Sequence, residues 1–223
     1  MKDNTLSKLG GTCSILLGIS YVVVGISALL MPAAQKTGTF EQLIVSITQN
    51  PTMILLNWWA KALGAVFALG AVAAISATVR AGNEGWVRWT SNLAIVGFAV
   101  TAIDNFRLQF LVPLRAAGYV AGDAMTKAAI ANNWRPVFLD PQGWLMFGAV
   151  GFWILVVSVL ALRWGAWPKP LAYAGIAGAI ALWLELASRV LGIGILDTIA
   201  SVAAVILGPI FLIWLGLRLR QAG

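Results

Sequence analysis

Histidine is absent from the 223-residue sequence, and cysteine occurs once, as Cys13. The absence of histidine excludes a His-ligated haem, the common zinc sites and a Ser-His-Asp triad. A single cysteine cannot form an intramolecular disulfide or a cysteine cluster that holds a metal. No nucleotide-binding or nucleophile motif is recognisable either. We therefore expect a protein that is not an enzyme, with no catalytic residues, no metal and no cofactor.

Charged residues are also scarce, at 10% of the chain, whereas hydrophobic residues make up 60%. A soluble domain has about a quarter of its residues charged. Because a soluble fold of this size cannot bury so much apolar surface, the lipid bilayer is the expected surrounding. The net charge of +7 would suggest nucleic acid in a soluble protein. Here the basic residues fall at predicted helix ends, so we expect no nucleic-acid partner.

Six hydrophobic runs are each long enough to cross a bilayer, which takes roughly 20 residues. The predicted spans are about 9–32, 53–79, 89–112, 143–165, 169–191 and 196–217. The first run is longer than the apolar part of a signal peptide, so we expect a retained helix. The predicted fold class is all-α, a polytopic transmembrane bundle of six helices. We expect residues 1–223 to form a single integral membrane domain.

Two long connections on one side of the predicted bundle contain helical patterns. Thr39 and Gln42 have the spacing of a capping box, and apolar residues from Phe40 onward fall on one helical face. In the second connection, Asp123 is placed to cap a helix that runs to about Trp134. The sequence therefore predicts two short amphipathic helices on the outer side.

Proline and small residues add two expectations about the spans. Pro113 should lie at the end of the third span, which leaves Pro209 as the proline expected inside a helix. Small residues recur at a spacing of four and predict close helix contacts. They are Ala60, Gly64 and Ala68 in the second span, and Ala174 and Gly178 in the fifth.

The distribution of basic residues predicts an orientation through the positive-inside rule. With the N-terminus in the cytoplasm, the short cytoplasmic segments carry Lys2, Lys8, Arg80, Arg88, Arg163, Lys169, Arg218 and Arg220. The longer outer connections carry Lys36, Arg115, Lys127 and Arg135. Both termini are thus predicted to be cytoplasmic, and a bacterial inner (plasma) membrane is the default expectation.

Six charged residues fall within the spans or at their outer ends: Lys61, Asp104, Arg107, Glu185, Arg189 and Asp197. A charge in the middle of a membrane helix costs about 2.5–3.5 kcal/mol, so such groups should face the bundle interior or a water-filled cavity. Asp104 and Arg107 are three residues apart, and Glu185 and Arg189 are four apart, so each pair shares a helix face. Lys61 and Asp197 would need partners from neighbouring helices. Asn57 lies one turn from Lys61.

These seven residues admit two interpretations. In the first, they line an outward-facing pocket, roofed by the two outer helices, that binds a small polar or amphiphilic ligand. In the second, they form a salt-bridge network that holds the second, third, fifth and sixth spans together.

Three functions follow from these interpretations. In the first, the chain is a small permease, channel or ligand-binding membrane protein that uses the pocket. Alternatively, it is a non-catalytic accessory or structural subunit of a larger membrane complex, with other membrane subunits or copies of itself as partners. An intramembrane enzyme that acts on lipids has the least support, because no nucleophile or metal motif is present.

Overall fold

The computed structural model describes residues 4–134 and 138–222, and every regular element in that part of the chain is helical. In chain order the elements are α1 (Asn4–Leu30), α2 (Ala33–Thr37), α3 (Phe40–Gln49), α4 (Thr52–Val79), the 3₁₀ turn η1 (Arg80–Gly82), α5 (Glu84–Ala121), α6 (Ala124–Asn132), the π-helical turn η3 (Trp144–Ala149), α7 (Val150–Trp164), α8 (Lys169–Leu191) and α9 (Gly194–Ala222). Six segments are long and apolar enough to cross a membrane: α1, α4, α5, η3 with α7, α8 and α9. The predicted all-α bundle of six spans is confirmed.

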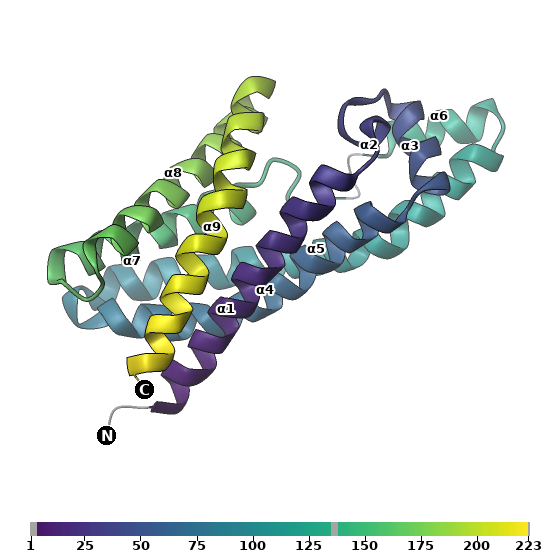
Figure 1. Ribbon diagram of the computed structural model, residues 1–223. Helices are drawn as coiled ribbons and strands as arrows, with labels where there is room; N and C mark the ends of the chain where they lie inside the picture. Colours follow the sequence, from purple (N-terminus) through teal and green to yellow (C-terminus); the bar gives the residue numbers. More distant parts are fainter. Residues whose placement is uncertain (1–3, 135–137, 223) are drawn as a thin grey trace.

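The two ends of the bundle differ (Figure 1). Both termini lie at one end, which we call the terminal end, whereas α2, α3 and α6 lie at the other, which we call the cap end. Helix α1 packs between α4 and α9, α5 runs along α4, and α8 packs between α7 and α9. A contact between α4 and α7 crosses the bundle. The six spans therefore form a ring that is filled where α4 meets α7.

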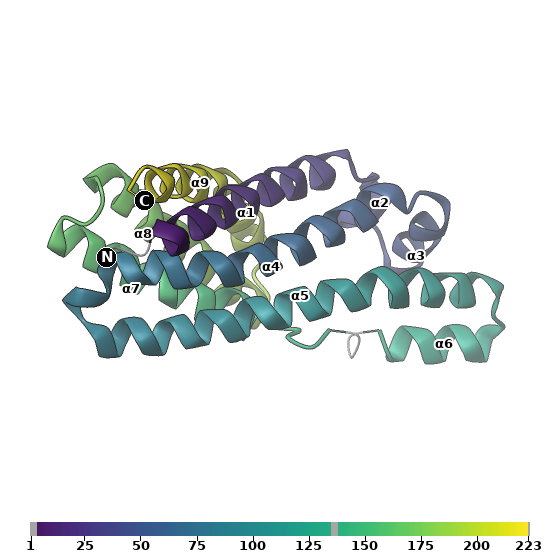
Figure 2. The same cartoon turned by 90° about the horizontal axis from the view of Figure 1, so that it is seen from below.

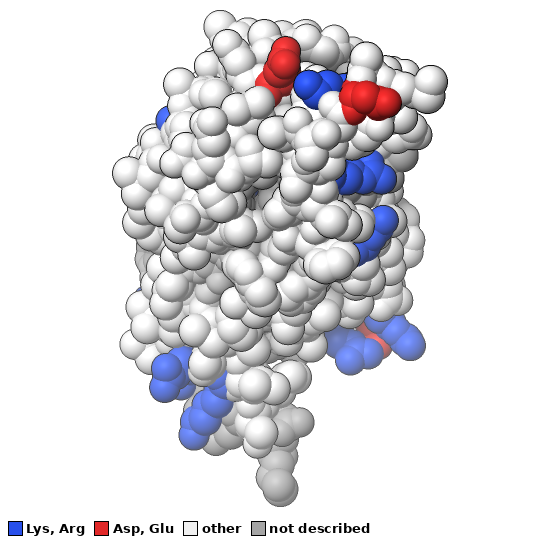
Figure 3. All heavy atoms as spheres, turned by 90° about the vertical axis from the view of Figure 1, so that its right-hand side faces the viewer, with Lys and Arg blue, Asp and Glu red and all other residues white. Residues whose placement is uncertain are grey.

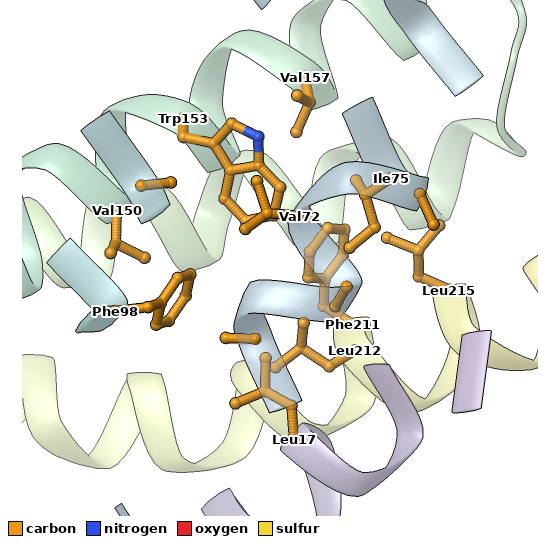
Figure 4. Close-up of a cluster of buried hydrophobic side chains, with 14 of the residues drawn as sticks. Leu17, Val72, Ile75, Phe98, Val150, Trp153, Val157, Phe211, Leu212 and Leu215 are labelled. Atoms are coloured by element: carbon orange, nitrogen blue, oxygen red, sulfur yellow. The ribbon is translucent and has the colours of Figure 1, made fainter. Parts of the chain in front are cut away.

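The half of the bundle nearer the terminal end has an apolar core (Figure 4). Trp153 of α7 is 1% exposed, and it packs with Val72 and Ile75 of α4. The indole nitrogen of Trp153 donates to the Ser76 hydroxyl at 3.0 Å, and Ser76 is 2.7 Å from Ser91 of α5. Satisfied hydrogen bonds of this kind hold α4, α5 and α7 together where water is absent.

Helix α5 departs from the prediction, because it continues through Pro113 to Ala121. Proline lacks an N–H, so a helix interior is an unfavourable place for it, and we had expected the span to end there. The helix continues because the part of α5 that lies at the cap end is packed against other helices. Leu108, Val112 and Ala116 of α5 form a buried cluster with Ile44 and Ile47 of α3. Tertiary packing thus outweighs the local cost of the proline. Pro209 lies inside α9, as predicted.

The two predicted outer helices are present as α3 and α6. Thr39 caps α3 in a complete capping box with Gln42, and the Asp123 carboxylate accepts a hydrogen bond from the Thr126 N–H at 2.8 Å. That bond holds the pKa of Asp123 below its ordinary value. Helix α6 folds back beside α5 (Figure 2). The prediction that these two helices cover the pocket is wrong. Helices α3 and α6 pack along the cap-end part of α5, away from α8 and α9.

Small residues support only some of the predicted close contacts. Gly64 of α4 lies against α1, where a β-carbon on it would come within 2.9 Å of the Ser20 β-carbon. By contrast, Gly178 of α8 has open space around it, so its predicted role in helix packing is wrong. Gly97 of α5 has a tight contact that we had not expected, because a β-carbon there would meet the backbone carbonyl of Leu145.

The outside of the bundle is largely uncharged. On the flank in Figure 3, lysine, arginine, aspartate and glutamate appear towards the edges, and other residues cover the middle. Exposed apolar side chains continue along α5 from Ile95 through Ile103 and Phe106 to Phe110 and Leu114. At 1.5 Å per residue, this apolar ridge is roughly 29 Å long, close to the thickness of a bilayer core. The fold therefore presents the surface that lipid requires.

Candidate functional site

Lys61 is unusual because it is exposed on the buried face of its helix. Its sequence neighbours Ala60 and Ala62 are buried, and so are Asn57 and Ala65 one turn away on either side. The lipid-facing residues of α4 include Leu63 and Val66, and these lie roughly 140–200° around the helix from Lys61 at 3.6 residues per turn.

Although it lies on this buried face, the Lys61 side chain stays accessible to solvent. The Lys61 ammonium interacts electrostatically with Glu185 and Arg189 of α8, which lies across the bundle. Tyr21 of α1 lies level with Lys61, because Asn57 bonds to the Val24 carbonyl on one side of it and Gly64 packs against Ser20 on the other. From the accessible charge on a helix face that is otherwise buried, we infer a recess in the bundle. We call this the Lys61 recess and define it by Tyr21, Lys61 and Glu185.

The α8 wall of the recess is held by an ion-pair chain. Arg189 donates to the Glu185 carboxylate at 2.9 Å, as the spacing of four predicted. The Arg189 Nε lies 3.9 Å from the Asp197 carboxylate of α9, which is also 3.2 Å from the Ser188 hydroxyl. The guanidinium of Arg189 stacks over the Phe147 ring of η3 at 4.6 Å. Arg189 therefore joins α8, α9 and η3.

Burial differs along this chain of groups. The Glu185 side chain is 10% exposed, whereas those of Arg189 and Asp197 are 41% and 48% exposed. The acid that interacts with Lys61 thus lies inside, and the outer pair reaches solvent at the α8–α9 turn. Asp197 finds its partner on a neighbouring helix, as predicted. Lys61 has no ion-pair partner within 4.0 Å among the described residues.

Asp104 and Arg107 of α5 belong to a second group. The Asp104 carboxylate is 2% exposed and accepts a hydrogen bond from the Leu139 N–H at 3.2 Å. The predicted close pair with Arg107 is absent, because no ion pair within 4.0 Å joins the two in the part of the chain that the structure describes. Asp104 instead anchors the segment that leads into η3.

Asp140 is the site residue that the sequence analysis missed. Its two carboxylate oxygens accept the backbone N–H groups of Gly143, Trp144, Leu145 and Met146, at 2.8–3.1 Å. Asp140 therefore caps η3, and Asp104 fixes the residue just before it. The signal was an Asp-Pro pair before an apolar run, which is typical of a helix start.

Trp59 of α4 stacks edge-on against Phe106 of α5, with ring centroids 5.7 Å apart. The Lys61 turn therefore lies level with Asp104. The two groups remain distinct, because Lys61 interacts with α8 and Asp104 binds the η3 connection.

Asn57 shares a face with Lys61, but its amide points to α1. It donates to the Val24 carbonyl and to the Ser27 hydroxyl, both at 3.0 Å. Asn57 is 4% exposed, so it acts as a clamp between α1 and α4. The seven predicted residues are thus divided among the recess with its ion-pair chain, the Asp104 anchor and this clamp.

Two shallow surface hollows lie elsewhere, at the terminal end. One is lined by Asn83, Gly85, Trp86 and Trp89, and the other by Thr5, Lys8, Leu9 and Thr12. Among the described residues, no group of three or more Cys, Asp or Glu side chains could hold a metal ion. The Lys61 recess, which has an accessible ammonium group, is therefore a better candidate for a functional site than these hollows.

Comparison with known proteins places the chain in a family. No curated protein matches it, and no solved structure matches it. One family model matches residues 13–218, which include the recess, the Asp104 anchor and all or most of each of the six spans. The chain therefore belongs to the family described as "Domain of unknown function (DUF4386)".

Proposed function

We propose that this membrane protein binds a small polar or amphiphilic ligand in the Lys61 recess and releases it in the course of transport. The observation that carries the proposal is the exposure of Lys61 on the otherwise buried face of α4. An ammonium at this depth is costly unless water, a counter-charge or a ligand reaches it. Intramembrane ionisable groups that face a bundle interior are the usual markers of substrate and ion pathways.

The fold gives the recess one direction in which to open. Below Lys61 the ring of spans is filled by the apolar core around Val72, Ile75 and Trp153. Towards the cap end, the ion-pair chain becomes progressively more exposed from Glu185 to Asp197. A ligand would therefore enter from the cap end. Nothing in this arrangement requires a catalytic step, and we propose a binding protein that is not an enzyme.

The alternative function is a non-catalytic subunit that docks other membrane subunits, or copies of itself, through its apolar exterior. That exterior is also what a lipid surrounding requires. The accessible Lys61, in contrast, has no role in a protein that only docks others. For this reason we favour ligand binding.

We also propose that the termini are cytoplasmic and that the cap end faces outward, in a bacterial plasma membrane. The described basic residues at the terminal end are Lys8, Arg80, Arg88, Arg163, Lys169, Arg218 and Arg220. At the cap end they are Lys36, Arg115 and Lys127, with Arg189 at the α8–α9 turn, whereas Lys2 and Arg135 lie outside the described residues. The excess of basic residues on the short segments at the terminal end supports this orientation through the positive-inside rule.

The recess can be tested by thiol accessibility. In a Cys13→Ser background, Lys61→Cys should react with a small, charged, membrane-impermeant methanethiosulfonate in nanodiscs. Leu63→Cys, on the lipid face, and Val72→Cys, in the core, are matched controls. We expect Lys61→Cys to react at least about tenfold faster than either, because the bilayer keeps the charged reagent from the Leu63→Cys thiol and the Val72→Cys thiol must wait for local opening. Equal rates at the three positions would contradict the recess and the function built on it.

A further inference from the structure

Two hydrogen-bonding side chains in the Lys61 recess, Lys61 and Tyr21, have no acceptor among the described residues. The Lys61 ammonium offers three N–H donors and the Tyr21 phenol offers one O–H donor. Neither group makes a hydrogen bond or an ion pair within 4.0 Å with any residue that the structure describes, Lys61 is an exposed residue, and the Tyr21 hydroxyl is not sealed from solvent. The Asn57 amide at a similar depth is satisfied, whereas a guanidinium nitrogen of Arg107 on α5 is buried without a partner among the described residues. The recess therefore has a surplus of donors.

The carboxylate that interacts with Lys61 does not reach it. Glu185 accepts a hydrogen bond from Arg189 through Oε1, and no ion pair within 4.0 Å joins Glu185 to Lys61 among the described residues. Asp197, farther out, is 3.2 Å from the Ser188 hydroxyl and 3.9 Å from Arg189. An anion with oxygen acceptors would satisfy both Lys61 and Tyr21, and the charge-assisted bond to Lys61 would be the stronger contact.

The charge of that anion is limited by Glu185. Lys61 has no ion pair within 4.0 Å among the described residues, and its electrostatic neighbours on α8 are Glu185 and Arg189. Arg189 is already paired with Glu185 and Asp197, so a dianion would gain no free second cation on α8 and would be repelled by Glu185 in a low-dielectric setting. A single negative charge is the best match.

We propose that the Lys61 recess binds a monoanionic oxygen acid group, a carboxylate or a phosphodiester, through Lys61 and Tyr21. This inference rests on the proposed function and names its ligand class. The acid group has two sources, a soluble acid from the aqueous phase or the head group of an amphiphile from the bilayer. Both sources would present the same acid group to Lys61 and Tyr21, and the experiment below distinguishes the two sources.

The test uses the full chain in a nonionic maltoside detergent and equilibrium binding of defined probes. Acetate and dimethyl phosphate represent soluble acids, and oleate and dihexadecyl phosphate represent amphiphiles. Oleyl alcohol and oleylamine are the neutral and cationic counterparts. We expect saturable binding of at least one anionic probe. Binding of acetate or dimethyl phosphate indicates a soluble ligand, and binding of the long-chain anions alone indicates an amphiphile.

Variants link binding to the two donors. Lys61→Gln should weaken the anionic probe at least about tenfold, and Tyr21→Phe by about threefold or more, since charged hydrogen bonds contribute more than neutral ones. Lys61→Arg should keep binding within a few-fold. Lys127→Gln, which removes a lysine from α6 of the cap, is the matched control and should bind like the original protein. If Lys61→Gln does not fold, Lys61→Arg and Tyr21→Phe decide the outcome.

Several results would overturn the inference. They are equal binding of oleate and oleyl alcohol, unchanged affinity in folded Lys61→Gln or in Tyr21→Phe, or no binding of any anionic probe. If oleylamine alone binds and Lys61→Cys is still labelled in nanodiscs, the ligand class is wrong while the proposed function stands. If Lys61→Cys is not labelled, the recess itself is wrong.

Discussion

Among single residues, Asp140 is notable because its carboxylate accepts four backbone N–H groups at the start of η3. In a membrane protein these donors have little water to replace the carboxylate. We predict that Asp140→Ala destabilises the fold by at least about 2 kcal/mol, from the loss of the cap and the unsatisfied donors. Asp140→Asn should have a smaller effect, because one carboxylate oxygen becomes an NH₂ group.

The measurement is unfolding by sodium dodecyl sulfate in mixed micelles. Asp123→Ala is the control, since Asp123 caps the exposed helix α6 with one backbone bond at 2.8 Å. Its effect should stay near the ordinary size of a cap, about 1 kcal/mol. If Asp140→Ala were no more harmful than Asp123→Ala, the four bonds would not stabilise η3 as we infer.

Residue-level predictions succeeded for one of the two pairs expected on a single helix, and the close Asp104–Arg107 pair is absent among the described residues. The spacing of four residues identified the Glu185–Arg189 pair, and hydropathy placed Lys61 within a span. Partners on other helices were not accessible to the sequence. Asn57 binds α1 and Asp104 binds the segment before η3, and each contact depends on how helices rotate and cross. Periodicity gives a helix face but not the neighbour that this face meets.

Among the helices and turns, η3 and α5 show how packing decides local structure. The helix α5 passes through Pro113 because α3 covers its outer part, which no propensity scale includes. Close packing also explains why the π-helical turn η3 fits beside α5. There, Gly97 lies directly against the Leu145 carbonyl. The hydropathy of the sequence predicted both spans, but this contact needs the three-dimensional arrangement.

A matched pair of glycine substitutions tests that contact. Gly97→Ala should destabilise the protein by about 1–3 kcal/mol, because the added methyl group meets backbone that cannot move without strain. Gly178→Ala lies in open space within α8 and should be neutral or stabilising by up to about 1 kcal/mol, through helix propensity. Unfolding midpoints in the same detergent mixture compare the two. An equal response would show that α5 and η3 are not in close contact.

For the whole molecule, the main feature is the difference between the two ends. The half near the termini is an apolar core closed by short connections, whereas the half near the caps contains Lys61, Glu185 and Asp104. If the basic residues set the orientation, this polar half lies in the outer leaflet and the recess faces the cell exterior. Orientation therefore decides from which side a ligand reaches Lys61.

Two exposed positions at opposite ends test this orientation. Met125 of α6 is 81% exposed at the cap end, and Asn83 lies exposed between α4 and α5 at the terminal end. In intact cells, with Cys13→Ser as background, an impermeant maleimide should label Met125→Cys and leave Asn83→Cys unlabelled. After the membrane is permeabilised, both should react, which controls for thiol reactivity. The reverse pattern would place the cap end in the cytoplasm, and the Lys61 recess would then receive its ligand from inside the cell.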